Sequence, residues 1–248
     1  MAGTTALFGV ADARAYGEKA PVGHRPSEYL AEARSIVVVG RRLLDLPLDR
    51  IPSTRVEYTA DFHVANSELN RVLFELAAFL ERRGHAVFPV PYKEMPGWNL
   101  ENRSAASLKV MRHFLGVARV KEKTASRLWE NLSYRHMALE AGMGEIGVNN
   151  LLLTPGHGAR VRLVALLTDA PLEPGAPLVS HLCKPDSCGY ACVKACPAGA
   201  LSTGGEATDK AACLRYYLKL GIPGASGVRC GLCVARCPAH GKRFSEPP

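Results

Sequence analysis

The chain has 248 residues, a formal net charge of +8 and a hydrophobic content of 47%. This length suits one large domain, or a larger domain with a small one appended, and the apolar content is ample for a core. No apolar run approaches the roughly 18–20 residues of a membrane span, so no membrane-embedded function is expected. The basic residues are scattered, without the aromatic-interleaved stripe typical of nucleic-acid binders. We therefore expect a basic surface suited to an acidic redox partner, and no nucleic acid.

The hydrophobic pattern alternates between helical and strand-like segments along the chain. Continuous β-branched runs predict buried strands, and apolar residues three or four apart predict helices. In chain order we expect a helix over 26–33, a strand over 35–40, a helix over 61–83 with Asp61 as its N-cap, a strand over 86–90, a pocket-lining loop over 91–102, helices over 104–115 and 124–141, and a strand over 161–169. The alternation fits an α/β or an α+β sandwich, and the pattern leaves both open.

A proline-rich connector over 171–178 separates this region from the rest of the chain. We expect one domain over 1–178 and a second over 179–248. The glycine pattern Gly142-x-Gly144-x-x-Gly147 spells a dinucleotide fingerprint, but it follows a predicted helix where the fingerprint needs a strand. We therefore do not assign a phosphate loop here, and a helix C-cap with a tight turn is an alternative role for these glycines.

All eight cysteines lie in the last quarter of the chain, and the first 182 residues have none. Disulfides would need an oxidising compartment, and the start of the chain shows no signal peptide. A structural zinc site would use paired Cys-x2-Cys knuckles, of which Cys230 and Cys233 form the only one. Both cysteine runs end in Cys-Pro, at Cys196 and Cys237. This ending is typical of two-cluster ferredoxins, in which the last cysteine of each run crosses to the other cluster.

Eight cysteines match the eight thiolates that two [4Fe–4S] clusters require. We expect one cluster on a first group of cysteines, Cys183, Cys188, Cys192 and Cys237. The other cluster falls to a second group, Cys196, Cys213, Cys230 and Cys233. Three alternatives stay open. Cys213 could be a small buried apolar residue. Because the spacing of the first run is wider than usual, a [3Fe–4S] centre or one non-ligating cysteine also fits.

The segment from Ala141 to Asp169 resembles the corrinoid-binding core of the epoxyqueuosine reductases and the reductive dehalogenases. The elements that carry the resemblance are Gly-Met-Gly-Glu-Ile-Gly from Gly142, Leu-Leu-Thr-Pro from Leu152, and Arg-Val-Arg-Leu from Arg160 with Thr168-Asp-Ala-Pro-Leu. The run that follows Cys213 resembles the lone cluster ligand and next helix of the epoxyqueuosine reductases. The resemblance spans about residues 28–238 and implies an α+β fold. This fold is a nitroreductase-like sandwich followed by a two-[4Fe–4S], bacterial ferredoxin-like domain.

The same resemblance implies a cobalamin between the two domains. A glycine-rich turn lets backbone amides approach a large flat macrocycle closely. Carried over position by position, the corrinoid contacts are Met143, Thr154, Gly158, Ala159, Arg160 and Val161, with Tyr216 and Leu218 approaching from the cluster side.

Three departures from the epoxyqueuosine reductases stand out. Their aspartate proton donor is matched by Leu128, and the lysine of their Gly-Lys-Asn is matched by Val148. The chain also ends ten residues after Pro238, without the helical extension that grips tRNA in that family. Without the twin-arginine signal of respiratory dehalogenases, we expect a cytoplasmic protein.

We therefore expect a cobalamin-dependent reductase of a small organic molecule, fed with electrons by an external ferredoxin or flavodoxin. Reduction needs a proton donor. The candidates near the pocket segment are Tyr134, His136, Glu145 and His157, and we choose Tyr134 because dehalogenase-like enzymes favour tyrosine. The alternatives are a non-catalytic di-cluster electron carrier or corrinoid-reducing activator that docks a partner protein, and a zinc-binding interaction module. Cobalt content distinguishes the cobalamin-dependent reductase from the electron carrier, which would hold iron and sulfide only.

Overall fold

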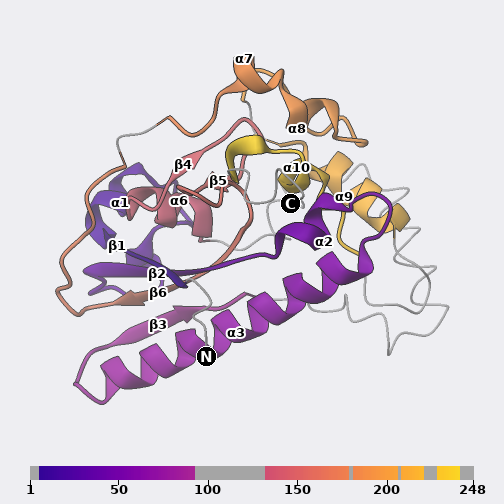
Figure 1. Ribbon diagram of the computed structural model, residues 1–248. Helices are drawn as coiled ribbons and strands as arrows, with labels where there is room; N and C mark the ends of the chain where they lie inside the picture. Colours follow the sequence, from indigo (N-terminus) through magenta and orange to yellow (C-terminus); the bar gives the residue numbers. More distant parts are fainter. Residues whose placement is uncertain (1–5, 93–131, 179–180, 206–207, 221–227, 241–248) are drawn as a thin grey trace.

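The computed structural model describes residues 6–92, 132–178, 181–205, 208–220 and 228–240 (Figure 1). Its main sheet has the strand order β1-β2-β6-β3, and each neighbouring pair is antiparallel. The strands are β1 (Ala6–Asp12), β2 (Ser35–Arg42), β3 (Val87–Val90) and β6 (Val161–Thr168). The two central strands, β2 and β6, pair over their full length, from Ser35 opposite Thr168 to Arg42 opposite Val161. A purely antiparallel sheet decides between the two expected classes in favour of α+β.

Helices cover both faces of this sheet. On one face Ile36 and Val38 of β2 pack with α1 (Ala13–Lys19) and α6 (Tyr134–Glu140). On the other face Val37 and Val39 pack against the long helix α3 (Val56–Glu81). Successive strand residues point to opposite faces, so a strand between two helical layers must be apolar at every position. This explains the unbroken Ile-Val-Val-Val run of β2.

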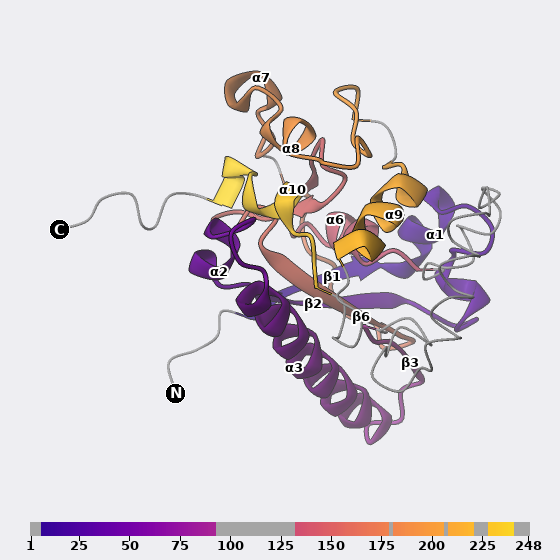
Figure 2. The same cartoon turned by 90° about the vertical axis from the view of Figure 1, so that its right-hand side faces the viewer.

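The remaining elements are short and lie mostly toward one end of the sheet. They are η1 (Pro26–Glu28), α2 (Asp45–Asp49), β4 (Glu145–Ile146), β5 (Leu152–Leu153), α7 (Pro185–Cys188), α8 (Ala191–Lys194), α9 (Lys210–Leu220), α10 (Leu232–Ala235) and η3 (Pro238–His240). Figure 2 shows α10 between α2 and α9. An apolar cluster joins Leu232 and Ala235 of α10 to Leu48 of α2 and Phe62 of α3. The segment with Cys230 and Cys233 is thus packed onto the first turns of α3.

Two sequence predictions of secondary structure are wrong. The segment 26–33 forms only the single 3-10 turn η1, which Pro26 opens and the Glu28 carboxylate holds through the backbone N–H of Gly23 and Arg25. The helix predicted to start at Asp61 begins at Val56, because the first turns pack on α10. Asp61 is instead buried inside α3, where its carboxylate accepts from the guanidinium of Arg41 at 3.2 Å and from the N–H of Leu44 at 2.8 Å.

Other predictions are confirmed, and some lie outside the described residues. The predicted strands over 35–40, 86–90 and 161–169 correspond to β2, β3 and β6. The helix over 124–141 is confirmed at Tyr134–Glu140, while its first part, the helix over 104–115 and most of the loop over 91–102 lie outside the described residues. Within the described ranges, no helix has both the length and the hydropathy of a membrane span.

Candidate functional site

The two Cys-Pro runs have the same local structure. Cys192 is the second residue of α8, and Cys233 is the second residue of α10. The residue before each helix is left-handed, with φ 57° at Tyr190 and 65° at Gly231. Each helix is one turn long and leads into its Cys-Pro pair, and α8 and α10 contact each other. The fold thus brings two equivalent cysteine-bearing turns face to face.

The four cysteines of the first group line one cavity. This cavity has a volume of about 390 Å³ and lies between the cysteine segments and the turn that follows β4. Its lining includes Cys183, Cys188, Cys192 and Cys237, together with Val148 and Asn149 of the turn and Leu153 of β5. A cavity lined by four thiols, two of them 54 residues apart in sequence, has the donor set of an iron–sulfur cluster.

The electrostatic neighbours of Cys237 follow the same grouping, and those of Cys233 do so apart from Cys192 of the first group, which also raises its pKa. Burial raises the pKa of Cys237, and the thiols of the first group, Cys192, Cys183 and Cys188, raise it further. Burial likewise raises the pKa of Cys233 to about 12, with added contributions from Cys230, Cys213 and Cys196 of the second group. Thiols this crowded resist joint ionisation unless a positive centre binds them. The two groups therefore suit metal-bound thiolates.

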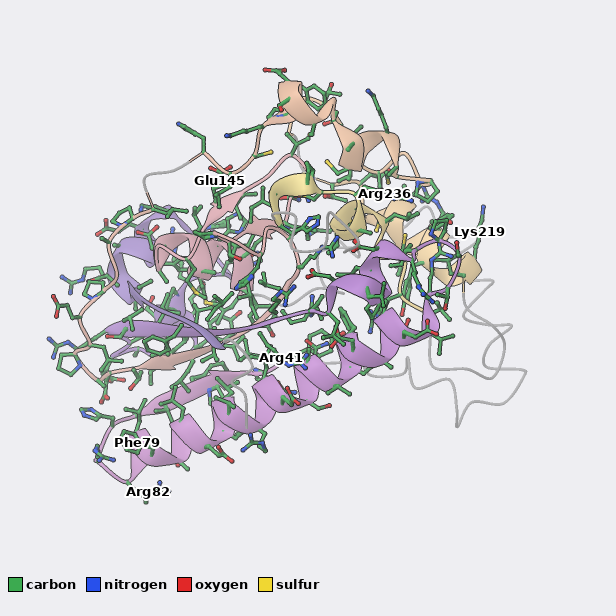
Figure 3. All side chains as sticks on the ribbon, in the orientation of Figure 1. Arg41, Phe79, Arg82, Glu145, Lys219 and Arg236 are labelled. Atoms are coloured by element: carbon green, nitrogen blue, oxygen red, sulfur yellow. The ribbon has the colours of Figure 1, made fainter. Side chains whose placement is uncertain are left out.

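Backbone N–H groups point at two of the sulfurs. Val148 N lies 3.5 Å from Cys183 Sγ, and Ala200 N lies 3.3 Å from Cys196 Sγ. Glu145, labelled in Figure 3, accepts a hydrogen bond from the N–H of Cys183 and so ties β4 to the first group. In the described residues no three His, Cys, Asp or Glu side chains converge on a single ion. A four-iron cluster uses one thiolate per iron, so its donors need not converge on one point.

The loop expected to contact a corrinoid is buried against the C-terminal segment. Thr154 and Gly158 close the loop through mutual backbone hydrogen bonds of 3.0 and 2.8 Å. Gly158 has φ +51°, and a methyl group there would lie 2.6 Å from the backbone nitrogen of His240. Ala159 packs in an apolar cluster with Cys237. The loop therefore abuts the first group of cysteines.

The other predicted corrinoid contacts differ in their surroundings. Arg160 is 1% exposed and forms ion pairs with Asp45 at 2.9 Å and Asp49 at 2.5 Å, so its charge is balanced within the protein. Val161 is buried at the start of β6, and Tyr216 is half-buried on α9. The Leu218 side chain lies outside the described residues.

Met143 and the glycines beside it serve the packing of the chain itself. Met143 is buried against Gly9 of β1, where a methyl group on the glycine would lie 2.6 Å from Met143 Cγ. A methyl group on Gly144 would lie 2.0 Å from the carbonyl oxygen of Leu153. Gly142, with φ +70°, follows α6 directly, as a C-cap and turn require. This close approach of backbone to backbone accounts for the glycine pattern without a phosphate or macrocycle.

Tyr134 contacts Pro91, which precedes Tyr92, a member of a set of two arginines and two aromatic rings that sequence reasoning did not single out. Its hydroxyl donates a 2.7 Å hydrogen bond to the carbonyl of Pro91. Burial lowers the pKa of Arg162, while interactions with Tyr92, Tyr58 and Tyr134 oppose this shift. The guanidinium carbons of Arg162 and Arg229 lie over the Phe62 ring, at 4.2 and 4.3 Å from its centre. We call this set the arginine–aromatic cluster: Phe62, Tyr92, Arg162 and Arg229.

The arginine–aromatic cluster borders the second group of cysteines. Arg229 directly precedes Cys230, and its backbone N–H donates to the Thr59 hydroxyl of α3 at 3.0 Å. Its guanidinium also lies 5.3 Å from the ring centre of Tyr217 on α9, the helix that carries Cys213. The members of the cluster are separated by at least 30 residues in sequence, so no local pattern could have revealed them.

Comparison with known proteins gives matches of two kinds. No protein-family model matches the chain. The chain is 45% identical over 80 residues to an epoxyqueuosine reductase from Listeria monocytogenes, a match covering 32% of this chain and 20% of the relative. It is 31% identical over 120 residues to a tetrachloroethene reductive dehalogenase from Sulfurospirillum multivorans, covering 41% and 22%. The matched segments thus span about a fifth of these relatives.

Solved structures share the fold over nearly the whole chain. A selenomethionine-labelled epoxyqueuosine reductase aligns with a TM-score of 0.58 and 19% identity, covering 94% of this chain and 61% of that one. A catabolic reductive dehalogenase aligns with a TM-score of 0.66 and 16% identity, covering 96% and 30%. Other neighbours are a reductive dehalogenase described as B12-dependent, one bound to 3-bromo-4-hydroxybenzoic acid, and an epoxyqueuosine reductase with a tRNA stem loop.

These likenesses show the fold of the chain and the proteins that it resembles. The mixed helix-and-sheet fold is the one that both groups of solved structures share over most of this chain. The curated matches identify the chain as a relative of the epoxyqueuosine reductases and reductive dehalogenases, as its sequence motifs predict.

Proposed function

We propose that this protein is an iron–sulfur reductase that passes electrons through two [4Fe–4S] clusters to a corrinoid, which reduces a small organic substrate. The observation that carries this proposal is the cavity lined by Cys183, Cys188, Cys192 and Cys237. Four thiols around one cavity, beside a second group of four, supply the eight ligands of two clusters. The reductase relatives and the reductase fold support the rest of the proposal.

When bound, the clusters and the corrinoid supply the electrons for the reduction. The protein's own part is to hold them close together and to exclude water. Cys237 lies in the cavity of the first group, although its run otherwise serves the second, so a covalent path would join the two clusters. The proposed ligands of the second group are Cys196, Cys213, Cys230 and Cys233. Exposure of Cys213 does not fit the alternative of a buried apolar residue.

The corrinoid part of the proposal rests on the relatives and on the loop between β5 and β6. One solved neighbour is described as B12-dependent. Gly158 and Ala159 lie against the segment that carries Cys237, so a macrocycle held by this loop would be near the first cluster. Because Arg160 and Thr154 have partners within the protein, we assign their contribution to backbone atoms. The full proposed contact set is Met143, Thr154, Gly158, Ala159, Arg160, Val161, Tyr216 and Leu218.

Tyr134 is the proposed proton donor. Its Oη is fixed by the hydrogen bond to the carbonyl of Pro91. The nearby positive charge of Arg162 would stabilise the negative charge left on that oxygen after the proton is transferred. Position and charge together suit a general acid, which reduction requires when electrons reach a substrate.

The substrate is proposed to be a small organic molecule, with a modified tRNA as the competing class. One epoxyqueuosine reductase neighbour was solved with a tRNA stem loop, and one dehalogenase neighbour with 3-bromo-4-hydroxybenzoic acid. The neighbour with a tRNA stem loop keeps a nucleic-acid substrate as a competing hypothesis, and the net charge of +8 is compatible with binding a phosphate backbone. We favour the small molecule because the proposed donor contacts Pro91, which precedes Tyr92, and the Tyr92 ring packs against that of Phe62.

The electron donor is proposed to be an acidic ferredoxin or flavodoxin from the cytoplasm, attracted by the net positive charge of the chain. A second function is favoured by one observation: the lysine of the epoxyqueuosine reductase motif is Val148 here, in the cavity lining of the first group. Its loss suits a non-catalytic electron carrier or corrinoid-reducing activator.

Cobalamin retention distinguishes the two functions. Anaerobically purified protein would be incubated with cobalamin, passed through a desalting column and supplied with reduced viologen and 3-bromo-4-hydroxybenzoic acid. A reductase retains cobalamin stoichiometrically and releases bromide only when loaded with it. Reducible clusters without retained cobalamin would establish the electron carrier instead.

A further inference from the structure

The arginine–aromatic cluster holds two positive charges that no described carboxylate balances. Arg162 Nε donates to the amide oxygen of Asn66 at 3.0 Å, and Arg229 Nη2 donates to the hydroxyl of Tyr92 at 3.0 Å. Both acceptors are neutral, and none of the ion pairs among the described residues includes either arginine. Burial lowers the pKa of Arg162, and the neighbouring Arg229 adds to that shift. Charges withdrawn from water without a counter-ion are costly unless a ligand supplies one.

Two hydrogen-bond donors in this cluster also lack an acceptor. Asn66 is 3% exposed, and its Nδ2 is buried without a hydrogen-bond partner. Arg229 Nε is buried and without a partner in the same way. Buried polar groups are normally satisfied, and each exception calls for an explanation. Asn66 bonds to Arg162 through its amide oxygen, so the surroundings of both arginines are short of acceptor oxygens.

The surroundings of the two arginines are flat and apolar. Their guanidinium carbons lie 4.2 and 4.3 Å from the centre of the Phe62 ring. The Tyr92 ring stands nearly at right angles to Phe62, at 5.6 Å between ring centres. Both arginines are only partly buried, so a ligand from solution can reach them. The site therefore combines a cationic head with aromatic walls.

We propose that Arg162 and Arg229 bind the carboxylate of an organic-acid substrate, with Phe62 and Tyr92 against its apolar part. Guanidinium groups match a carboxylate in both charge and planar geometry. The Tyr134 hydroxyl donates to the carbonyl of Pro91, the residue before Tyr92, so an acid bound against Tyr92 would lie near the proposed proton donor. This inference rests on the proposed function, since it names the substrate class of the same site.

The test is a binding measurement that needs no turnover. Benzoate and benzamide have the same ring and nearly the same shape, but only benzoate is charged. Calorimetric titration of the cluster-loaded full chain is expected to give at least about tenfold tighter binding for benzoate, the size of effect that charge-assisted hydrogen bonds produce. Equal affinities for the two probes would overturn the proposal, and this comparison depends on no variant.

Variants test whether Arg229 causes the preference for benzoate over benzamide. Arg229→Gln should reduce the benzoate preference to near unity, and Arg229→Lys should keep part of it. Arg83→Gln is the matched control, because Arg83 also covers an aromatic ring, at 3.5 Å from the centre of Phe79. Figure 3 shows Phe79 at the far end of α3 from the cysteine segments. An unchanged preference in Arg229→Gln, or an equal loss in Arg83→Gln, would contradict the assignment.

Two further titrations identify other anions. Inorganic phosphate that binds as tightly as benzoate would reveal a general anion site and overturn the assignment to an organic acid. Cobalamin carries a phosphate of its own, so its retention is measured in the same variants. Loss of cobalamin retention in Arg229→Gln with the benzoate preference intact would assign the arginines to the cofactor and overturn the proposal. If the wild type retains no cobalamin but prefers benzoate, the proposed reductase function fails while the anion site stands.

Discussion

Tyr134 is the single residue on which the proposed proton transfer depends. We predict that Tyr134→Phe lowers kcat about 100-fold, the lower end of what a general acid contributes. Cobalamin retention and the cluster EPR signals should stay unchanged, since the Tyr134 hydroxyl donates to the carbonyl of Pro91 and not to a cysteine. The matched control is Tyr29→Phe, whose hydroxyl also donates to a backbone carbonyl, that of Gly23 at 2.8 Å. Similar kcat values for the two variants would remove Tyr134 from the mechanism.

Arg160 shows how a predicted cofactor contact can serve the fold. Its guanidinium is 1% exposed and pairs with Asp45 and Asp49. We predict that Arg160→Gln lowers the free energy of unfolding by about 3 kcal/mol, because the nearly buried Asp45 carboxylate loses a charged partner. Denaturant titration of the cluster-loaded protein measures this change.

The control for Arg160 is an exposed ion pair. Arg71 pairs with Glu75 one helical turn away on α3, and both side chains are more than 60% exposed. Arg71→Gln should cost no more than about 0.5 kcal/mol. If Arg71→Gln lowered the free energy of unfolding as much as Arg160→Gln, the loss of one positive charge would explain both effects, and the burial of Arg160 would not matter.

At the scale of elements, the strands were more predictable than the helices. The runs 36–39 of β2 and 163–167 of β6 are unbroken and apolar because helices cover both faces, and this signal is local. The strand β1 was missed, since Ala6–Asp12 mixes small residues and a glycine that accommodates Met143. The start of α3 was missed because its first turns are stabilised by contact with α10, 170 residues further along the chain, and not by a capping residue.

The loop between β5 and β6 packs against the C-terminal segment. Two of its glycines allow the effect of backbone conformation to be distinguished from that of this contact. Gly158 and Gly156 both have positive φ, but only Gly158 faces the backbone of Ala239 and His240. We predict that Gly158→Ala displaces this segment and lowers the iron content, since Cys237 lies two residues before Ala239. Gly156→Ala should cost only about 1–2 kcal/mol of backbone strain and leave iron content unchanged. The iron content of both variants is measured. Equal iron contents would show that the contact of Gly158 with Ala239 and His240 has no role in cluster binding.

At the scale of the whole molecule, the cysteine grouping follows from local spacing, whereas the arginine–aromatic cluster needed the fold. The Cys-Pro endings and the count of eight are visible in the chain itself. In contrast, Phe62, Tyr92, Arg162 and Arg229 come from four separate regions, and their proximity depends on the pairing of β3 with β6 and on the docking of residues 228–230 onto α3. Tertiary contacts of this kind leave no periodic signal in a sequence.

Cys213 tests whether the two groups form two complete clusters. It stands alone in the sequence, on α9, and is the exposed member of its group. We predict that Cys213→Ser lowers the iron content from about eight per chain and removes or alters the EPR signal of one cluster only. Ala212→Ser, next to it on the same helix, is the control. An intact eight-iron protein after Cys213→Ser would mean that another ligand completes the second cluster.

The most direct measurement of the central claim is EPR spectroscopy on anaerobically purified protein after incubation with cobalamin, with iron and cobalt analysis of the same sample. The account predicts about eight irons per chain, bound cobalt, and signals from reduced [4Fe–4S] clusters beside that of base-off cob(II)alamin. About eight irons without cobalt would contradict the corrinoid and leave an electron-transfer protein. Zinc in place of iron would contradict the account altogether.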